Sequence, residues 1–147
     1  MSRILIRSFK PADEPQILDL WDECGLIVPQ NNPKKDIERK LKVNPELFLI
    51  GILDNNIVAS CMAGYEGHRG WINYLAVSPN YRRRGIATDM MKATEYKLRE
   101  MGCPKINLQV RASNHEIIKF YESIGFSDDH VLGMGKRLEQ DKAWEVD

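Results

Sequence analysis

The most informative segment of the chain reads Leu75-Ala76-Val77-Ser78-Pro79-Asn80-Tyr81-Arg82-Arg83-Arg84-Gly85-Ile86-Ala87. It begins as an apolar strand, passes through a short loop with three arginines, and enters a helix at Gly85. A glycine at this point lets a ligand approach the backbone where a side chain would block it. The unpaired amides of a first helical turn and the positive end of the helix dipole together bind phosphate. The segment therefore predicts an anion-binding loop between a strand and a helix.

Two common nucleotide-binding motifs are absent from this segment. No Gly-Lys-Ser/Thr follows the loop, as a Walker motif requires, and the glycine pattern is not Gly-x-Gly-x-x-Gly. The sequence therefore argues against nucleoside triphosphate hydrolysis and against NAD binding. Three consecutive arginines are often only a solvated surface, but their position directly before a helix start favours an anion site.

Composition and length limit the possible classes of protein. The 147 residues fit a single domain spanning residues 1–147, with 21 Lys and Arg balancing 21 Asp and Glu. The zero net charge disfavours nonspecific binding to nucleic acid or to a membrane surface. No apolar run approaches the roughly 20 residues of a membrane span, and the first residues resemble a strand rather than a cleaved signal, which predicts a cytoplasmic protein. The three scattered cysteines predict reduced thiols and no metal site.

Hydrophobic periodicity predicts the order of helices and strands. Alternation predicts strands near residues 4–9, 47–54, 57–64, 71–77 and 106–110, with a hairpin turn at Asn55-Asn56. It also predicts a final strand at 131–138, which Gly133 and Gly135 weaken. Apolar residues at helical spacing predict helices over 17–24, after Pro33, over 86–101 and over 114–124, the last one capped by Ser113 with Glu116. The long crossover before the strand at 106–110 predicts a parallel pair, so we expect an α/β protein with a mixed sheet.

Two motifs together resemble the GNAT superfamily of acetyl-CoA-dependent N-acetyltransferases. Arg82-x-x-Gly85-x-Ala87 resembles the pyrophosphate loop of that family, and Asn114 followed by Phe120-Tyr121-Glu122-x-x-Gly125-Phe126 resembles its second motif. The resemblance implies a central, mostly antiparallel sheet with a splayed parallel pair and about four helices. Glu66-Gly67-His68-Arg69-Gly70-Trp71 and Gly135-Lys136-Arg137-Leu138 further resemble a small bacterial subgroup of the YpeA type.

The resemblance also implies which residues bind acetyl-CoA. Backbone groups of Leu75 and Val77 would pair with the pantetheine arm as with a strand, the loop amides would hold the pyrophosphate, and Asn114 would reach the pantetheine. Asn114 as a helix cap is the alternative. The predicted cofactor-binding residues are Leu75, Ala76, Val77, Arg82, Arg83, Arg84, Gly85, Ile86, Ala87, Thr88, Asn114 and Tyr121.

Tyr121 and Glu66 are the predicted catalytic residues. Helical periodicity places Tyr121 in the core, but the resemblance favours it as the general acid that protonates the leaving thiolate. Glu66 is the only carboxylate just before the strand at 71–77, so it is the candidate base, with His68 or water as alternatives and a plain polar turn equally compatible. Possible acceptor contacts are His68, Arg69, Trp71 and Tyr74.

The sequence predicts an N-acetyltransferase in which a primary amine attacks acetyl-CoA directly in a ternary complex. The amine belongs to a small molecule or to a protein, and the sequence does not choose between them. The alternative is a non-catalytic acyl-CoA-binding sensor, whereas nucleic-acid binding is disfavoured by the neutral charge. A homodimer is also possible, because an exposed final strand can pair across two copies.

Overall fold

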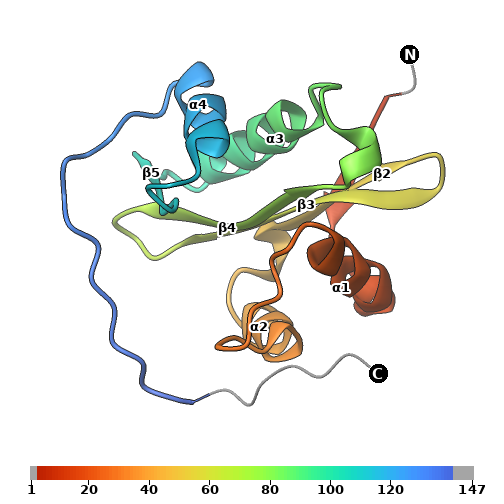
Figure 1. Ribbon diagram of the computed structural model, residues 1–147, viewed down its shortest axis with the longest axis horizontal. Helices are drawn as coiled ribbons and strands as arrows, with labels where there is room; N and C mark the ends of the chain where they lie inside the picture. Colours follow the sequence, from red (N-terminus) through yellow and green to blue (C-terminus); the bar gives the residue numbers. More distant parts are fainter. Residues whose placement is uncertain (1–2, 141–147) are drawn as a thin grey trace.

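Residues 3–140, which the computed structural model describes, form one five-stranded sheet with four α-helices. The strand order is β1-β2-β3-β4-β5, in which the first four strands are antiparallel neighbours and β4 and β5 run parallel. Helices α1 and α2 cover one face of the sheet, and α3 and α4 cover the other (Figure 1). This architecture confirms the predicted mixed α/β fold class, including the parallel pair.

The bounds of the elements follow the predicted order closely. The strands are β1 (Leu5–Ser8), β2 (Phe48–Leu53), β3 (Asn56–Tyr65), β4 (Gly70–Val77) and β5 (Ile106–Leu108). The helices are α1 (Glu14–Glu23), α2 (Pro33–Lys40), α3 (Ile86–Glu100) and α4 (His115–Ser123), with short 3-10 helices η1 (Pro11–Asp13), η2 (Pro45–Leu47) and η3 (Pro79–Tyr81). Within residues 3–140, none of the helices has both the length and the apolar character needed to cross a membrane.

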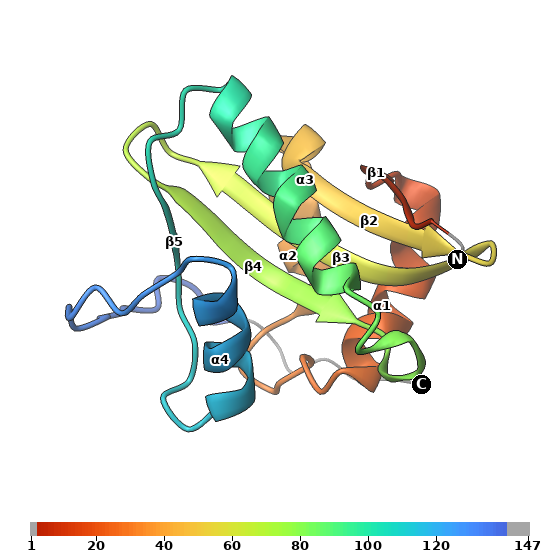
Figure 2. The same ribbon diagram turned by 90° about the horizontal axis from the view of Figure 1, so that it is seen from above.

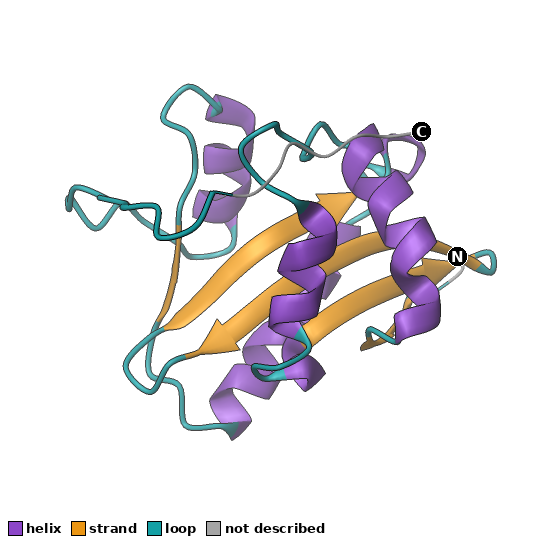
Figure 3. Ribbon diagram, turned by 90° about the horizontal axis from the view of Figure 1, so that it is seen from below, coloured by secondary structure: helices purple, strands orange, loops and turns teal. Residues whose placement is uncertain are grey.

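The core has two layers because the central strands are buried on both faces. Along β2, Leu49 packs with the α3 residues Met90 and Leu98 on one side of the sheet. Its neighbours Phe48 and Ile50 pack with Trp21 and the rest of α1 on the other side. Alternation of side chains along a strand produces this division, and Figures 2 and 3 show the two helix layers in turn.

The β2–β3 hairpin turns one residue earlier than the sequence predicted. Asp54 and Asn55, rather than Asn55 and Asn56, take the left-handed conformation, with φ of 53° and 63°. Two consecutive residues with positive φ suit the right-handed twist of the flanking strands. Asn56 is therefore the first residue of β3.

Strand β5 separates from β4 after a short pairing. Their register joins Gly70 to Ile106 and ends where Ile72 meets Leu108. The predicted strand over 106–110 is therefore too long by two residues, because Gln109 and Val110 leave the sheet. Within residues 3–140, the edge of β4 beyond Ile72 has no strand beside it (Figure 2).

The predicted final strand over 131–138 is wrong, because this segment runs as extended chain without a strand partner in the described part of the molecule. Val131, Leu132, Met134 and Leu138 are 76 to 92% exposed. Leu132, Met134 and Leu138 would share one face of a strand, but Gly133 and Gly135 between them weaken a strand and add no side chain to bury. The apolar alternation therefore did not produce a strand in this segment.

The cap of α4 also differs from the prediction. The side chain of Asn114, rather than that of Ser113, accepts a hydrogen bond from the Ile117 amide at 3.2 Å. Asn114 is the residue immediately before the first helical residue, where an oxygen reaches the third amide of the helix. Ser113 lies one position too early for this geometry.

Candidate functional site

A cleft of about 670 Å³ opens where β4 and β5 separate. Residues from both faces of the sheet line it, and they come from α2, β4, the end of β5 and α4. The lining residues are Leu26, Asn31, Asp36, Arg39, Lys40, Met62, Ile72, Asn73, Tyr74, Leu75, Leu108, Gln109, Val110, Arg111, Asn114, Ile117 and Tyr121. A hollow of this size holds a small molecule or one end of a larger one.

A β-bulge in β4 shapes the wall of this cleft. Ser60 pairs with Ala76 and Met62 pairs with Asn73, so β4 contains one residue more than β3 over this interval. Tyr74, inside the bulge, has a φ of 50°, which is costly for a bulky residue and is found where function or packing requires it. A bulge redirects backbone and side chains locally, and here it does so beside the free edge of β4.

Buried hydrogen bonds hold the bulge in place. The Ser60 hydroxyl donates to the Tyr74 carbonyl oxygen at 2.7 Å and accepts from the Trp21 indole nitrogen at 2.9 Å. The rings of Trp21 and Tyr74 stack with centroids 3.8 Å apart. The phenol of Tyr74 donates to the Asp36 carboxylate at 2.6 Å, which joins the bulge to α2. Tyr74 is thus fixed at its backbone, its ring and its hydroxyl.

Tyr121 lies on the α4 side of the same cleft. It is 7% exposed, and its ring packs edge-on against Phe126. Burial, and then the nearby Cys61 thiol, raises the pKa of the phenol, so it stays protonated at neutral pH. Its hydroxyl makes no hydrogen bond to any other residue in the range 3–140. A buried phenol usually has a partner, so this hydroxyl is available to a ligand in the cleft.

The predicted anion-binding loop lies between the end of β4 and α3. The Arg82 guanidinium donates from Nε to the Val77 carbonyl oxygen at 3.1 Å, and the Arg84 guanidinium lies 5.1 Å from the centre of the Tyr81 ring. Gly85 caps α3 with φ of 77° and no atom within 4 Å of an added Cβ. Gly85 has no side chain to cap α3, and no side chain of residues 3–140 accepts from its first amides, which leaves them for an anion.

Four of the predicted site residues lie in or next to the β3–β4 turn and do not line the cleft. The Glu66 carboxylate accepts hydrogen bonds from the backbone amides of Arg69 and His68, and these bonds lower the pKa of Glu66. His68 is exposed in the same turn, and Trp71 is 37% exposed at the start of β4. The structure therefore places the Glu66 carboxylate in the turn and outside the cleft, and its part in catalysis stays a prediction.

Among the other predicted residues, the structure brings Tyr74, Leu75, Asn114 and Tyr121 together in the cleft. Asn114 uses its side-chain oxygen as the cap of α4, so the capping interpretation describes its contacts. Ala76 is buried in the core beneath α1, and its side chain therefore points away from the cleft.

Sequence reasoning missed four charged residues that line the cleft, namely Asp36, Arg39, Lys40 and Arg111. Asp36 and Lys40 belong to a helix rich in charged residues, where nothing in the local pattern separates a cleft residue from a solvated one. Only the packing of α2 against the sheet identifies them. Ser60 was missed for a related reason, because a serine within an apolar strand gives no sign of the carbonyl it supports.

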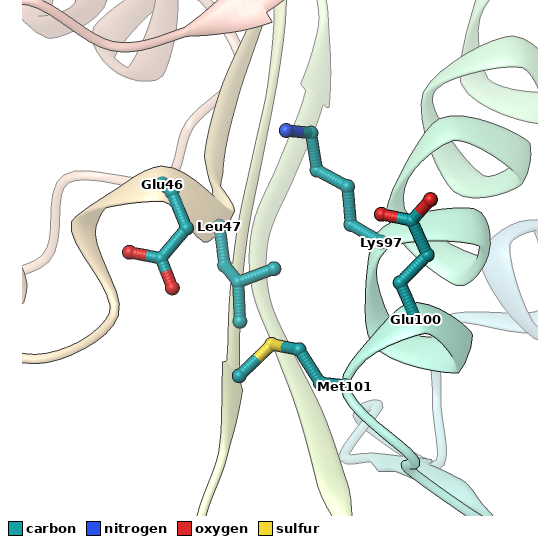
Figure 4. Close-up of a pocket in the computed structure, with 5 residues that line it drawn as sticks. All are labelled: Glu46, Leu47, Lys97, Glu100 and Met101. Carbon is teal, nitrogen blue, oxygen red and sulfur yellow. The ribbon is translucent and has the colours of Figure 1, made fainter.

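A smaller hollow of about 280 Å³ lies elsewhere, between η2 and the end of α3. Figure 4 shows Glu46 and Leu47 on one wall and Lys97, Glu100 and Met101 on the other. It shares no residue with the larger cleft. Within residues 3–140, no group of three or more His, Cys, Asp or Glu side chains is arranged to hold a metal ion.

Comparison with known proteins identifies relatives along almost the whole chain. Residues 13–126 match the model of the acetyltransferase (GNAT) family. The chain is 46% identical over 140 residues to an acetyltransferase of Sodalis glossinidius, covering 95% of this chain and 99% of that protein.

Solved structures with the same fold are more distant in sequence. The structure of AAC(6')-Iy in complex with the bisubstrate analogue CoA-S-monomethyl-acetylneamine has a TM-score of 0.75 and 18% identity, covering 92% of this chain and 99% of that one. The ribosomal-protein-S18-alanine N-acetyltransferase from Escherichia coli has a TM-score of 0.71 and 21% identity, covering 85% of this chain and 78% of that one. At these identities the likeness shows the fold alone.

Proposed function

Because the chain belongs to the acetyltransferase (GNAT) family, we propose that it transfers the acetyl group of acetyl-CoA to a primary amine within a ternary complex. The observation that supports this most directly is Tyr121, a largely buried residue that lines the cleft and whose hydroxyl has no hydrogen-bond partner among residues 3–140. It lies where the splayed strands leave room for a thioester between the two faces of the sheet.

The donor would bind along the free edge of β4 and the loop before α3. Backbone groups of Leu75 and Val77 are placed to pair with an extended pantetheine arm, as in strand addition. The Val77 carbonyl oxygen already accepts from the Arg82 guanidinium and from the Cys24 thiol. The amides of Gly85 to Thr88, with Arg83 and Arg84 nearby, would hold the pyrophosphate at the positive end of α3. Nothing crowds Gly85, and the site therefore fits this group.

When bound, acetyl-CoA would supply an activated acetyl group as a thioester. The amine nitrogen forms a bond to the acetyl carbon, and the carbon–sulfur bond then breaks. Tyr121 donates its phenolic proton to the departing sulfur. The bulge at Tyr74 redirects the backbone of β4 beside the cleft, and amides there would stabilise negative charge on the carbonyl oxygen.

The amine must lose a proton before or during the attack, and we assign this task to Asp36. It is the only carboxylate among the residues of the described chain that line the cleft. It lies on the α2 side of the sheet, across from Tyr121, and it is held by Tyr74. Glu66, the base predicted from sequence, is a weaker candidate for two reasons. Its turn contacts hold it outside the cleft, and its lowered pKa makes the carboxylate a weaker base.

A direct assay tests the proposal. Purified protein, acetyl-CoA and a panel of primary amines are monitored for free thiol release and, by mass spectrometry, for acetylated amine. Amine-dependent release is expected. A protein that binds acetyl-CoA without transferring acetyl to any amine is instead the acyl-CoA sensor, which is the alternative function.

A further inference from the structure

Four charged side chains, one acidic and three basic, line the cleft, three from α2 and one from the turn after β5. They are Asp36, Arg39, Lys40 and Arg111. Asp36 pairs with Arg39 at 3.3 Å, and Arg39 also approaches Glu139 at 3.7 Å. Neither Lys40 nor Arg111 makes an ion pair with another residue in the range 3–140. The cleft therefore has two positive charges that no described side chain neutralises.

Lys40 is the more constrained of these two cations. It is half-buried, and burial lowers the pKa of its ammonium. Its Nζ lies 3.6 Å from the position that a Cβ on Gly64 would take, so the side chain runs along β3. Glu46 attracts it only from beyond ion-pair distance. A partly desolvated cation without a counterion is unfavourable, and an anionic ligand would compensate for it.

The phosphates of acetyl-CoA are not the expected partners of Lys40. They are assigned to the loop before α3, whereas Lys40 ends α2 on the opposite face of the sheet (Figures 1 and 3). Arg111 approaches the cleft from another element, the turn between β5 and α4. The two cations therefore line the cleft from separate elements, and neither belongs to the loop before α3.

We propose that the acceptor is a small amine that also has a carboxylate. This inference relies on the function proposed above. Lys40 and Arg111 bind the carboxylate, and Asp36 receives the proton of the amine. A polyamine or an aminoglycoside has additional ammonium groups, which would face Lys40 and Arg111 with like charge. The cleft volume of about 670 Å³ suits a small molecule.

Matched pairs of amines test this assignment. L-lysine is compared with cadaverine, and 4-aminobutyrate with propylamine, since each pair differs by one carboxylate. The measurement is kcat/KM for thiol release at saturating acetyl-CoA. We expect the carboxylated member of at least one pair to be preferred by 10-fold or more, and this preference to shrink as salt screens the charges.

Variants then connect the preference to the two cations. Lys40→Gln and Arg111→Gln should each raise KM for the carboxylated amine about 10- to 100-fold with little change in kcat. The matched control is Lys42→Gln, because Lys42 is exposed just beyond α2 and does not line the cleft. It should leave the preference unchanged.

Several results would overturn the proposal. They are a preference for the diamines, equal use of both members of each pair, or a preference that survives both cleft substitutions. If no amine in the panel is acetylated, the melting temperature of the CoA-bound protein is measured with each amine added. Only the carboxylated amines should raise it. Exclusive acetylation of an acidic peptide would also contradict a small-molecule acceptor. Failure to bind acetyl-CoA, by contrast, would contradict the proposed function itself.

Discussion

Tyr121 is the residue on which the proposed chemistry depends most. Tyr121→Phe removes one hydroxyl, and since that hydroxyl has no partner among residues 3–140, packing and stability should hardly change. Turnover should fall about 10²- to 10⁴-fold, the usual contribution of a general acid, with acetyl-CoA affinity unchanged. The measurement is kcat beside a binding isotherm for acetyl-CoA.

An acyl donor with a more acidic leaving thiol provides the control for Tyr121→Phe. Such a thiolate needs less protonation, so the loss of turnover should be smaller with this donor. Wild-type turnover in the variant, accompanied by lower stability, would make Tyr121 a core residue only. Water or another group would then have to protonate the sulfur.

Asp36 and Glu66 form a pair of carboxylates whose roles a direct comparison can separate. Asp36→Asn should lower kcat/KM at neutral pH by about 10²-fold or more, because the only cleft carboxylate is lost. Glu66→Gln should leave kcat/KM within about 2-fold, because its carboxylate serves a turn. Rates between pH 6 and 9 for both variants provide the check, and the reverse pattern would restore Glu66 as the base.

The loop between β4 and α3 is the element that the proposal assigns to the donor. Gly85→Val introduces a side chain where no protein atom lies within 4 Å, so its steric effect falls on a bound ligand rather than on the core. Left-handed backbone at φ of 77° adds strain of about 1–2 kcal/mol for a non-glycine residue. Saturating acetyl-CoA should raise the melting temperature of the wild type by about 5–10 °C, and this rise should disappear in the variant.

Gly102→Val is the matched control for the loop. Gly102 has a similar φ of 85° and equally open surroundings, but it follows α3 at the opposite end from the loop. Both variants should lose comparable stability without ligand. Only the loop variant should lose the response to acetyl-CoA, and an equal loss in both would assign the effect to strain.

At the scale of the whole molecule, an ion pair between β1 and η1 links stability to pH. The Arg7 guanidinium contacts the Asp13 carboxylate at 2.8 and 2.9 Å, and this bond lowers the pKa of Asp13. A carboxylate with a lowered pKa adds stability above the pKa of the unfolded chain, about 3.9, and loses it as pH falls through the folded value.

Asp13→Asn should therefore destabilise the protein at pH 7 by about 1–3 kcal/mol, the usual value of a hydrogen bond to a charged group. The difference from wild type should shrink below about pH 4 and vanish at lower pH, where Asp13 of the wild type is protonated. Urea unfolding at several pH values measures this. A difference that stays constant down to pH 2 would show that the charge of Asp13 is not its cause.

Sequence analysis predicted those parts of the molecule whose signals are local. The element order follows from hydrophobic periodicity, and the parallel pair follows from the length of the connection between its strands. The glycine before α3 follows from the left-handed backbone at that position. The sequence does not indicate which residues of distant segments lie together in space. Asp36 and Lys40 therefore could not be distinguished from the solvated charges of α2. The wrong prediction of a strand over 131–138 has the same cause. A strand needs a neighbouring strand, and this segment has none among residues 3–140.

The bulge at Tyr74 has a consequence for how such an enzyme can diversify. Its backbone lies beside the free edge of β4 that we propose for the donor, and its hydroxyl bonds to Asp36, which we propose as the base for the acceptor amine. A substitution at Tyr74 would disturb both substrates together, so natural variation in acceptor choice should avoid this position. Lys40 and Arg111 lie on separate elements and touch neither the bulge nor the loop before α3. Substitutions at these two positions can therefore change the acceptor preference without altering the residues proposed for acetyl transfer.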